Sequence, residues 1–212
     1  NVNLTLNINT TDTSLTFPVI PENINLKSTL KASLSGITDS LHLDASLHVD
    51  TISMEDISAG NLSAKLISDF SPEKLIAGNT ETPDKNIYND FLNGLFFVAN
   101  ISTRSAAYSN YDIDSSSIQL EKKYDTISGT VNIHSSAGNL GTHFKVGEIF
   151  SSPVYLVNAS LKNADLSKII LNEAYTTDLN FNFLAEGKGI KPGNAMINLD
   201  ITSIGSSVFG HQ

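Results

Sequence analysis

The residues best suited to metal chemistry lie in one short segment, where His42, Asp44, Ser46, His48 and Asp50 alternate with apolar residues. Imidazole and carboxylate groups are ligands of zinc and other transition metals. If the segment is a strand, these five side chains share one face, and successive members lie about 7 Å apart. One strand cannot bring them around a single ion, so we interpret them as a solvated outer face rather than a metal site.

A second candidate is the start of a calcium-binding loop at Asp112 and Asp114, followed by Ser116. Such a loop needs glycine at its sixth position and a bidentate glutamate at its twelfth. Those positions hold Ser117 and Lys123 here, so the sequence does not predict a calcium site.

Other catalytic patterns also fail. The chain has no cysteine and no Gly-x-Ser-x-Gly nucleophile motif, and His134, His143 and His211 stand in no arrangement that marks a general base. The glycine pair around Lys188 precedes an expected strand rather than a helix, which argues against a phosphate-binding loop. We therefore expect neither an enzyme nor a bound cofactor.

Charge narrows the possible partners. Thirteen basic against 22 acidic residues give the 212-residue chain a net charge of −9, which would repel nucleic acid. The longest apolar run, residues 95–99, is far too short to span a bilayer. The chain begins within an alternating strand pattern and without a signal peptide, so we expect it to be a piece of a longer protein.

Alternation of apolar and polar residues is the dominant pattern and predicts a mainly β fold. Side chains on a strand point alternately to its two faces, and an antiparallel sheet can leave one face in water. We expect roughly ten strands in a long antiparallel sheet, with the clearest at residues 2–8, 41–49, 127–133, 179–185 and 195–201, and weaker ones at 15–17, 24–34, 57–66, 106–120, 142–149 and 154–161.

Two or three short helices interrupt this pattern. Capping residues and apolar spacing predict them at residues 72–77, 86–95 and 165–171. The third is expected to cover one end of the apolar surface with Leu166, Ile169 and Ile170. These breaks divide the chain into an N-terminal β unit (1–78), a linker and helix (79–104) and a C-terminal β unit (105–212), within what we expect to be one continuous sheet.

The apolar face of such a sheet must be covered or occupied. It can form the core of a sandwich, close into a barrel, or line a trough that holds acyl chains, and alternation alone does not choose among these. The residues that the pattern assigns to this face are Leu41, Leu43, Leu47, Val49, Ile127, Val131, Ile133, Leu179, Phe181, Phe183, Ile197, Leu199 and Ile201.

Part of the chain resembles a known superfamily. The strand at 154–163, the short Asp165-Leu166-Ser167-Lys168 helix start and the Thr177-Asp178-Leu179-Asn180 strand start resemble AsmA/TamB envelope proteins. The Gly-x-Gly at 187–189, the strand after it and the segment 41–70 are similar to further units of that family. The likeness covers about half of the chain, and its motifs are degenerate.

This resemblance implies a trough with an apolar inside and a polar outside. It implies a protein in the periplasm of a Gram-negative-type bacterium, anchored in the inner membrane by a segment outside this chain. The implied function is phospholipid transport toward the outer membrane, or outer-membrane protein assembly with a β-barrel partner. Two alternatives stay open from the residues: a surface β-sandwich adhesin and a structural spacer.

Overall fold

The computed structural model describes residues 2–17, 20–37, 39–54, 57–71, 95–108, 111–149, 151–189, 193 and 195–208. Within these ranges the chain is mainly β, as the alternation predicts. Thirteen strands of the described residues form one sheet. Their bounds are β1 Val2–Phe17, β2 Ile20–Ile37, β3 Ser40–Met54, β4 Ile57–Phe70, β5 Phe96–Thr103, β6 Ser105–Tyr108, β7 Tyr111–Lys123, β8 Thr126–Ser135, β9 Gly138–Gly147, β10 Val154–Ala164, β11 Thr177–Lys188, β12 Met196–Ser203 and β13 Ser207–Val208.

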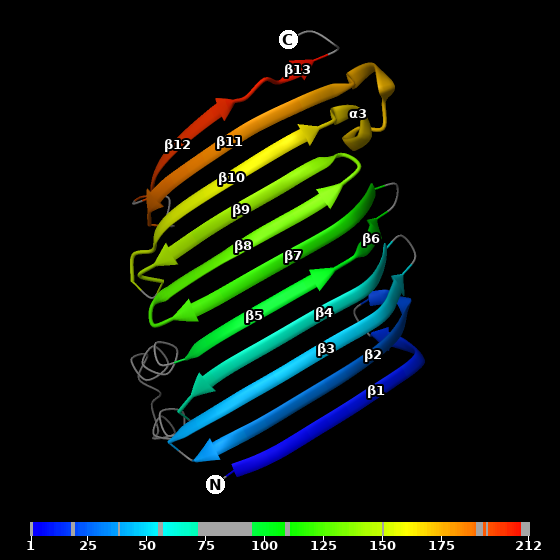
Figure 1. Cartoon of the computed structure of the whole chain (residues 1–212), viewed down its shortest axis with the longest axis vertical. Coiled ribbons are helices and arrows are strands. Elements are labelled where there is room, and N and C mark those ends of the chain that lie inside the picture. The colour runs from blue at the N-terminus through cyan, green and yellow to red at the C-terminus, as the bar shows by residue number, and fades with distance from the viewer. Residues whose placement is uncertain are drawn as a thin grey trace.

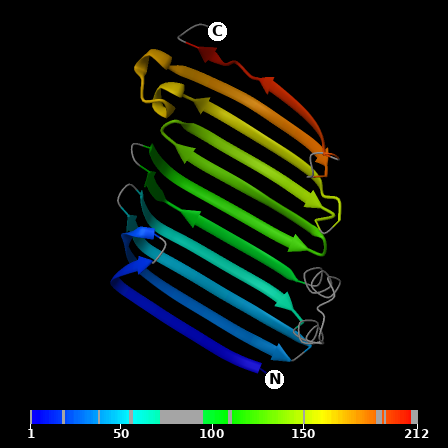
Figure 2. The same ribbon diagram turned by 180° about the vertical axis from the view of Figure 1, so that it is seen from behind.

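Every paired strand is antiparallel to its neighbour, and strand order almost follows chain order. The path runs from β1 to β5, then through β7 to β12, as Figures 1 and 2 show. The short strand β6 pairs with β4 and β7 beyond the end of β5, and β13 pairs with β11 beyond the end of β12. This arrangement is a meander, in which each connection needs only to reverse the chain.

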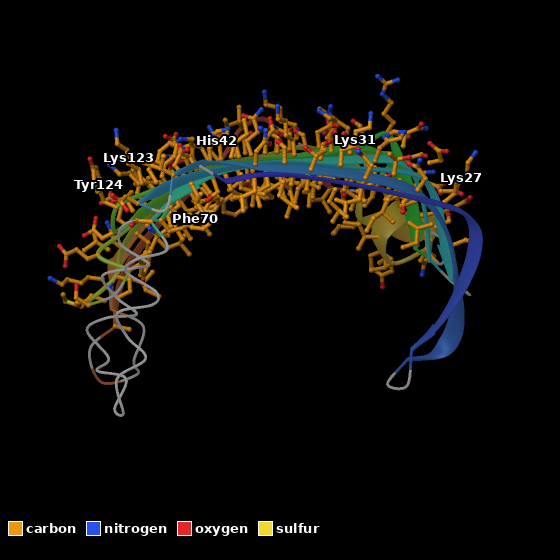
Figure 3. The ribbon with its side chains drawn as sticks, turned by 90° about the horizontal axis from the view of Figure 1, so that it is seen from below. Lys27, Lys31, His42, Phe70, Lys123 and Tyr124 are labelled. Carbon is orange, nitrogen blue, oxygen red and sulfur yellow. The ribbon has the colours of Figure 1, made fainter. Side chains whose placement is uncertain are left out.

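The sheet is curved into an arch when viewed along its long axis (Figure 3). Phe70 lies on the inner side of the arch, whereas Lys31 and His42 lie on the outer side. Shifts of register occur between Lys27 and Ser28 on β2 and between Thr10 and Thr13 on β1. Lys27 lies close to the point where β2 bends at one side of the arch (Figure 3). Such bulges bend a strand and increase its twist. We call the two sides of the arch the concave face and the convex face.

No second layer of described residues covers the concave face. Leu41, Val49 and Ala164 are the buried hydrophobic residues of the described part of the chain, whereas eighteen large hydrophobic residues there are exposed. A β-sandwich core would bury most of its inward side chains against a facing sheet about 10 Å away. Of the three architectures left open by the alternation, the described residues form a trough.

One α-helix and one 3-10 helix are described, α3 at Leu166–Ile169 and η1 at Glu173–Tyr175. Asp165 begins α3 as expected from the sequence, because its carboxylate accepts a hydrogen bond from the Ser167 backbone N–H at 3.0 Å. The helix lies on the concave side at one rim of the arch (Figure 3).

The prediction that α3 buries its apolar residues is wrong. Ile169 and Ile170 are 42% and 50% exposed, and only Leu166 is half-buried. A four-residue helix makes little more than one turn, too short to hold a continuous apolar stripe against the sheet. The buried residues of this region are Ala164, which precedes the helix, and the polar residues Ser167 and Thr177, which belong to the cap.

Several strands differ from the sequence-based expectation. The two strands expected at 2–8 and 15–17 form the single strand β1. Residues 96–103 lie in the stretch expected as linker and helix but form β5, which joins β4 to β7 and makes the sheet continuous. The single strand expected at 106–120 is divided into β6 and β7. The helices expected at 72–77 and 86–95 lie outside the described residues, apart from Leu95.

Candidate functional site

The concave face is built from rows of side chains that run across the sheet. Residues paired directly across antiparallel strands lie on the same face, so the register joins one residue from each strand into a row. The central row contains Leu6, Ala32, Ala45, Leu66, Ala99, Leu120, Gly129, Phe144, Val157, Ala185 and Leu199, in order from β1 to β12.

No member of the central row has a polar side chain. At a spacing of about 4.8 Å between strands, the ten steps from β1 to β12 make a row roughly 48 Å long. An apolar track of this length follows from pairing alone, because each strand contributes one residue and the register does not slip along it.

A second row lies beside the central row, two residues along each strand. Its polar member is Thr142. The row contains Ile8, Leu30, Leu47, Ala64, Ile101, Ile118, Val131, Thr142, Ala159, Phe183 and Ile201. The rings of Phe181 and Phe183 are 6.0 Å apart on β11, where they widen the apolar surface beside this row.

The third row lies on the other side of the central row and is more polar. It contains Leu4, Leu34, Leu43, Ser68, Phe97, Lys122, Ile127, Val146, Tyr155, Gly187 and Ile197. Ser68 is buried, and its hydroxyl donates to the Phe96 carbonyl at 3.0 Å. On this side, the central row therefore lies next to polar groups that form hydrogen bonds within the protein.

Lys122 is the charged member of the third row. Only 3% of the residue is exposed, and its ammonium donates hydrogen bonds to the carbonyls of Leu95, at 2.9 Å, and Tyr124. Burial lowers the pKa of Lys122 below its usual value. The ammonium is directed to backbone oxygens near the rim, so the charge is held by the protein and is not offered to the open trough.

All thirteen residues that the sequence assigns to the apolar face lie on the concave face. The register joins Leu43, Leu47, Ile127, Val131, Phe183, Ile197, Leu199 and Ile201 to the three rows, and alternation along β3, β8 and β11 places Leu41, Val49, Ile133, Leu179 and Phe181 on the same side. Their exposure differs: Leu41 and Val49 are buried, whereas Ile197 on the edge strand is 68% exposed.

The sequence-based assignment of the apolar face left out several strands that contribute to the concave face. Leu66 on β4, Leu120 on β7 and Phe144 on β9 are central to it, and their strands show weaker alternation. On β5 the signal is hidden because Phe96 and Val98 are apolar but lie on the convex side, next to concave Phe97. The apolar side chains of β1, Leu4, Leu6 and Ile8, alternate cleanly and could have been assigned.

The convex face carries the polar half of the same strands. The row opposite the central row consists of Asn7, Lys31, Ser46, Lys65, Asn100, Gln119, Thr130, His143, Asn158, Leu184 and Asp200. Its ion pairs are exposed, such as Lys65 with Asp44 at 3.5 Å, and exposed pairs add little stability. This face keeps the sheet hydrated.

The histidine and aspartate segment considered for metal binding lies on β3 on the convex side. His42 pairs with Asp69 at 2.7 Å, while His48 and Lys27 both contact Asp50, at 3.0 and 3.1 Å. The hydrogen bond from Lys27 lowers the pKa of Asp50. Most of these contacts join β3 to side chains of β2 and β4, and no group of three or more potential ligands among the described residues could hold a metal ion.

No helix in the described part of the chain has the length and apolarity required to cross a membrane. No protein-family model, curated protein or solved structure matches this chain. The geometry of the sheet is therefore the basis for any proposed function.

Proposed function

We propose that the concave face binds the acyl chains of phospholipids, and that the chain is a bridge-like module of the bacterial envelope through which lipid moves between the inner and outer membranes. The observation that carries this proposal is the central row, which is apolar on all eleven strands it crosses. Acyl chains need an apolar surface and no hydrogen-bond partners.

The open side of the arch favours a lipid that moves along the concave face over a ligand that stays bound in one place. A closed pocket surrounds its ligand, whereas a track without a second layer lets a polar headgroup stay in water while the tails lie on the sheet. The rows also repeat similar side chains from strand to strand. A lipid that moves by one strand spacing meets nearly the same surface, so no single position traps it.

The resemblance of residues 154–163, 165–168 and 177–180 to AsmA/TamB proteins supports the same proposal. It also gives the proposed setting: the periplasm, an inner-membrane anchor outside this chain, and for some family members a β-barrel partner in outer-membrane protein assembly. A surface adhesin would need loops that present binding groups, and the described apolar side chains gather instead on the sheet.

The test compares the two faces of one strand. A photo-crosslinking amino acid is placed at Phe183, on the concave face, or at Asn182, its exposed neighbour on the convex face, and the protein is produced in a Gram-negative host. We expect phospholipid adducts at position 183, detected by mass spectrometry, and none at position 182. Equal labelling at both positions, or none at either, contradicts lipid binding by the concave face.

Native mass spectrometry of the chain purified without detergent gives a second readout. We expect bound phospholipid that is lost when Phe183 is replaced by Asp and kept when Asn182 is replaced by Asp. A protein that is folded, monomeric and free of lipid in both forms would favour a structural spacer.

A further inference from the structure

The apolar part of the concave face narrows on β7. A fourth row lies beyond the second row, and from β5 to β12 it contains Thr103, Ser116, Ile133, Leu140, Leu161, Phe181 and Ser203. On β8 the four rows hold no polar side chain, and their members are Ile127, Gly129, Val131 and Ile133. On β7 the same rows hold Lys122, Leu120, Ile118 and Ser116. Of the four rows, the central and second rows alone are therefore apolar on β7.

On the side of the third row, β7 has almost no accessible surface beside Leu120. Lys122 on β7 and Ser68 on β4, both in the third row, are 3% and 5% exposed. Their polar groups donate hydrogen bonds to the carbonyls of Leu95 and Phe96. A lipid tail on the central row cannot shift to this side at β7, because Lys122 presents so little surface to the trough.

On the side of the fourth row, the contiguous apolar surface of β7 ends at Ser116, which is half-buried. Hydrocarbon that covers a serine hydroxyl displaces water and replaces none of its hydrogen bonds. The next apolar residue along the strand, Ile113, lies beyond a shift of register. Thr103, the partner of Ser116 on β5, has its hydroxyl bonded to the carbonyls of Gly60 and Ser105 at 2.9 and 3.0 Å. Ser116 is therefore the residue that limits the apolar width on this side.

The row spacing gives the width of the apolar surface on each strand. Neighbouring rows are two residues apart along a strand, about 7 Å, so the four rows on β8 span about 27 Å and the two rows on β7 about 14 Å. Hydrocarbon chains in contact lie about 4–5 Å apart. Two tails therefore fit side by side on β7, whereas four tails need about 16–20 Å and do not fit.

We propose that β7 is a neck in the trough, at which two-tailed lipids pass in single file and lipids with four or more tails are excluded. This inference rests on the proposed function and specifies which lipids the concave face transports. The tails lie along the rows, because a tail parallel to β7 would reach Ser116 or Lys122 directly beyond Ile118 and Leu120. Ser116 and Ile118 are then the residues that determine specificity for the number of tails.

Transfer between vesicles tests the neck with two lipids of the same headgroup chemistry. Phosphatidylglycerol has two tails, whereas cardiolipin, in which one glycerol joins two phosphatidyl groups, has four. Each lipid is labelled in donor vesicles, and the purified chain moves it to acceptor vesicles. We expect the transfer of phosphatidylglycerol to be faster than that of cardiolipin by about tenfold or more.

A wider neck should admit the four-tailed lipid. Ser116→Val adds a third apolar row on β7 and widens it to about 20 Å. Ser116→Thr is the matched control, because threonine has nearly the same shape as valine and keeps the hydroxyl. We expect cardiolipin transfer to rise severalfold with Ser116→Val and to stay at the wild-type rate with Ser116→Thr. Phosphatidylglycerol transfer should be unchanged in both.

A narrower neck should stop the two-tailed lipid without preventing its binding elsewhere. Ile118→Thr leaves the central row as the one apolar row on β7, and we expect phosphatidylglycerol transfer to fall by about tenfold. Phospholipid adducts at position 183 should remain, since Phe183 lies on β11, and their presence shows that the variant is folded. Ile133→Thr makes the same substitution in the fourth row on β8, keeps the central and second rows apolar, and should transfer at the wild-type rate.

Three results would overturn the neck: similar transfer rates for the two lipids in the wild type, equal cardiolipin transfer by Ser116→Val and Ser116→Thr, or equal loss of phosphatidylglycerol transfer in Ile118→Thr and Ile133→Thr. Each of these leaves adducts at position 183 and the proposed function intact. Absence of both adducts and transfer in the wild type would instead reject the proposed function, and this inference with it.

Discussion

The ring of Tyr155 lies directly over Gly187 on the concave face. A Cβ atom built on Gly187 would lie 2.3 Å from the ring carbon Cζ, and the Tyr155 hydroxyl donates across the glycine to the Met196 carbonyl at 3.3 Å. Glycine in a strand has no side chain to pack, and an aromatic ring from the neighbouring strand can cover it. Tyr155 of β10 therefore contacts both β11, through Gly187, and β12, through the Met196 carbonyl.

Gly187→Ala should therefore displace the Tyr155 ring and lower the free energy of unfolding by about 1–3 kcal/mol, measured by urea denaturation. Gly147→Ala is the matched control, because among the described residues its new methyl group would meet only the Thr126 hydroxyl, at 3.7 Å. In a Tyr155→Ala background the cost of Gly187→Ala should largely disappear. A full cost in that background would mean that the ring does not constrain position 187.

A charge in the middle of the central row should block movement of lipid along it. Ala99 lies on β5 between Leu66 and Leu120, and its neighbour Asn100 is exposed on the convex face. We expect Ala99→Lys to slow phospholipid transfer by about tenfold or more, since moving an acyl chain past a charge at a cost of about 1.4 kcal/mol already changes a rate tenfold. The measurement is transfer of labelled phospholipid between vesicles, and Asn100→Lys should transfer at the wild-type rate.

The two adjacent lysines at the end of β7 should contribute differently to stability. Lys122 is buried with its ammonium bonded to two carbonyls, whereas Lys123 is exposed with its ammonium 5.8 Å from the Tyr124 ring centroid. Lys122→Ala removes the donor and should lower the free energy of unfolding by about 1–3 kcal/mol. Lys123→Ala should change it by less than about 0.5 kcal/mol. Equal effects in thermal or urea melts would contradict the assigned role of Lys122.

The cap of α3 should make stability depend on pH in the acid range. Hydrogen bonding from Ser167 and from the Thr177 backbone N–H lowers the pKa of Asp165 below its usual value of 3.8. The folded state therefore favours the carboxylate: this contribution is complete above the unfolded pKa and is lost as the pH falls through the lower folded value.

Asp165→Asn keeps an acceptor oxygen but does not titrate, so the difference in melting temperature between it and the wild type should shrink as the pH is lowered below 4. Asp165→Ala should melt below Asp165→Asn at pH 7, because it also lacks the acceptor for Ser167 and Thr177. A difference between wild type and Asp165→Asn that stays constant from pH 7 to pH 2.5 would exclude this linkage.

The sequence by itself determined the strands and their two faces. Alternation such as that of Leu41, Leu43, Leu47 and Val49 fixes which side chains share a face, because the strand period of two is a property of the backbone. The same local reasoning found the Asp165 cap, where an acceptor and its donor are two residues apart. It failed on β5, where apolar Phe96 and Val98 conceal the alternation, since their convex positions follow from pairing with β4 rather than from the strand itself.

The tertiary structure decided whether the apolar face is covered, because coverage depends on residues distant in sequence. Leu179, Phe181 and Phe183 would look the same in a sandwich core and in a trough. Only the strand pairing shows that one residue from each of eleven strands, from Leu6 to Leu199, lines up in a single row. The exposure of Ile169 was decided in the same way: its apolar spacing was visible in the sequence, but burial requires an opposing surface, and the structure leaves Ile169 42% exposed.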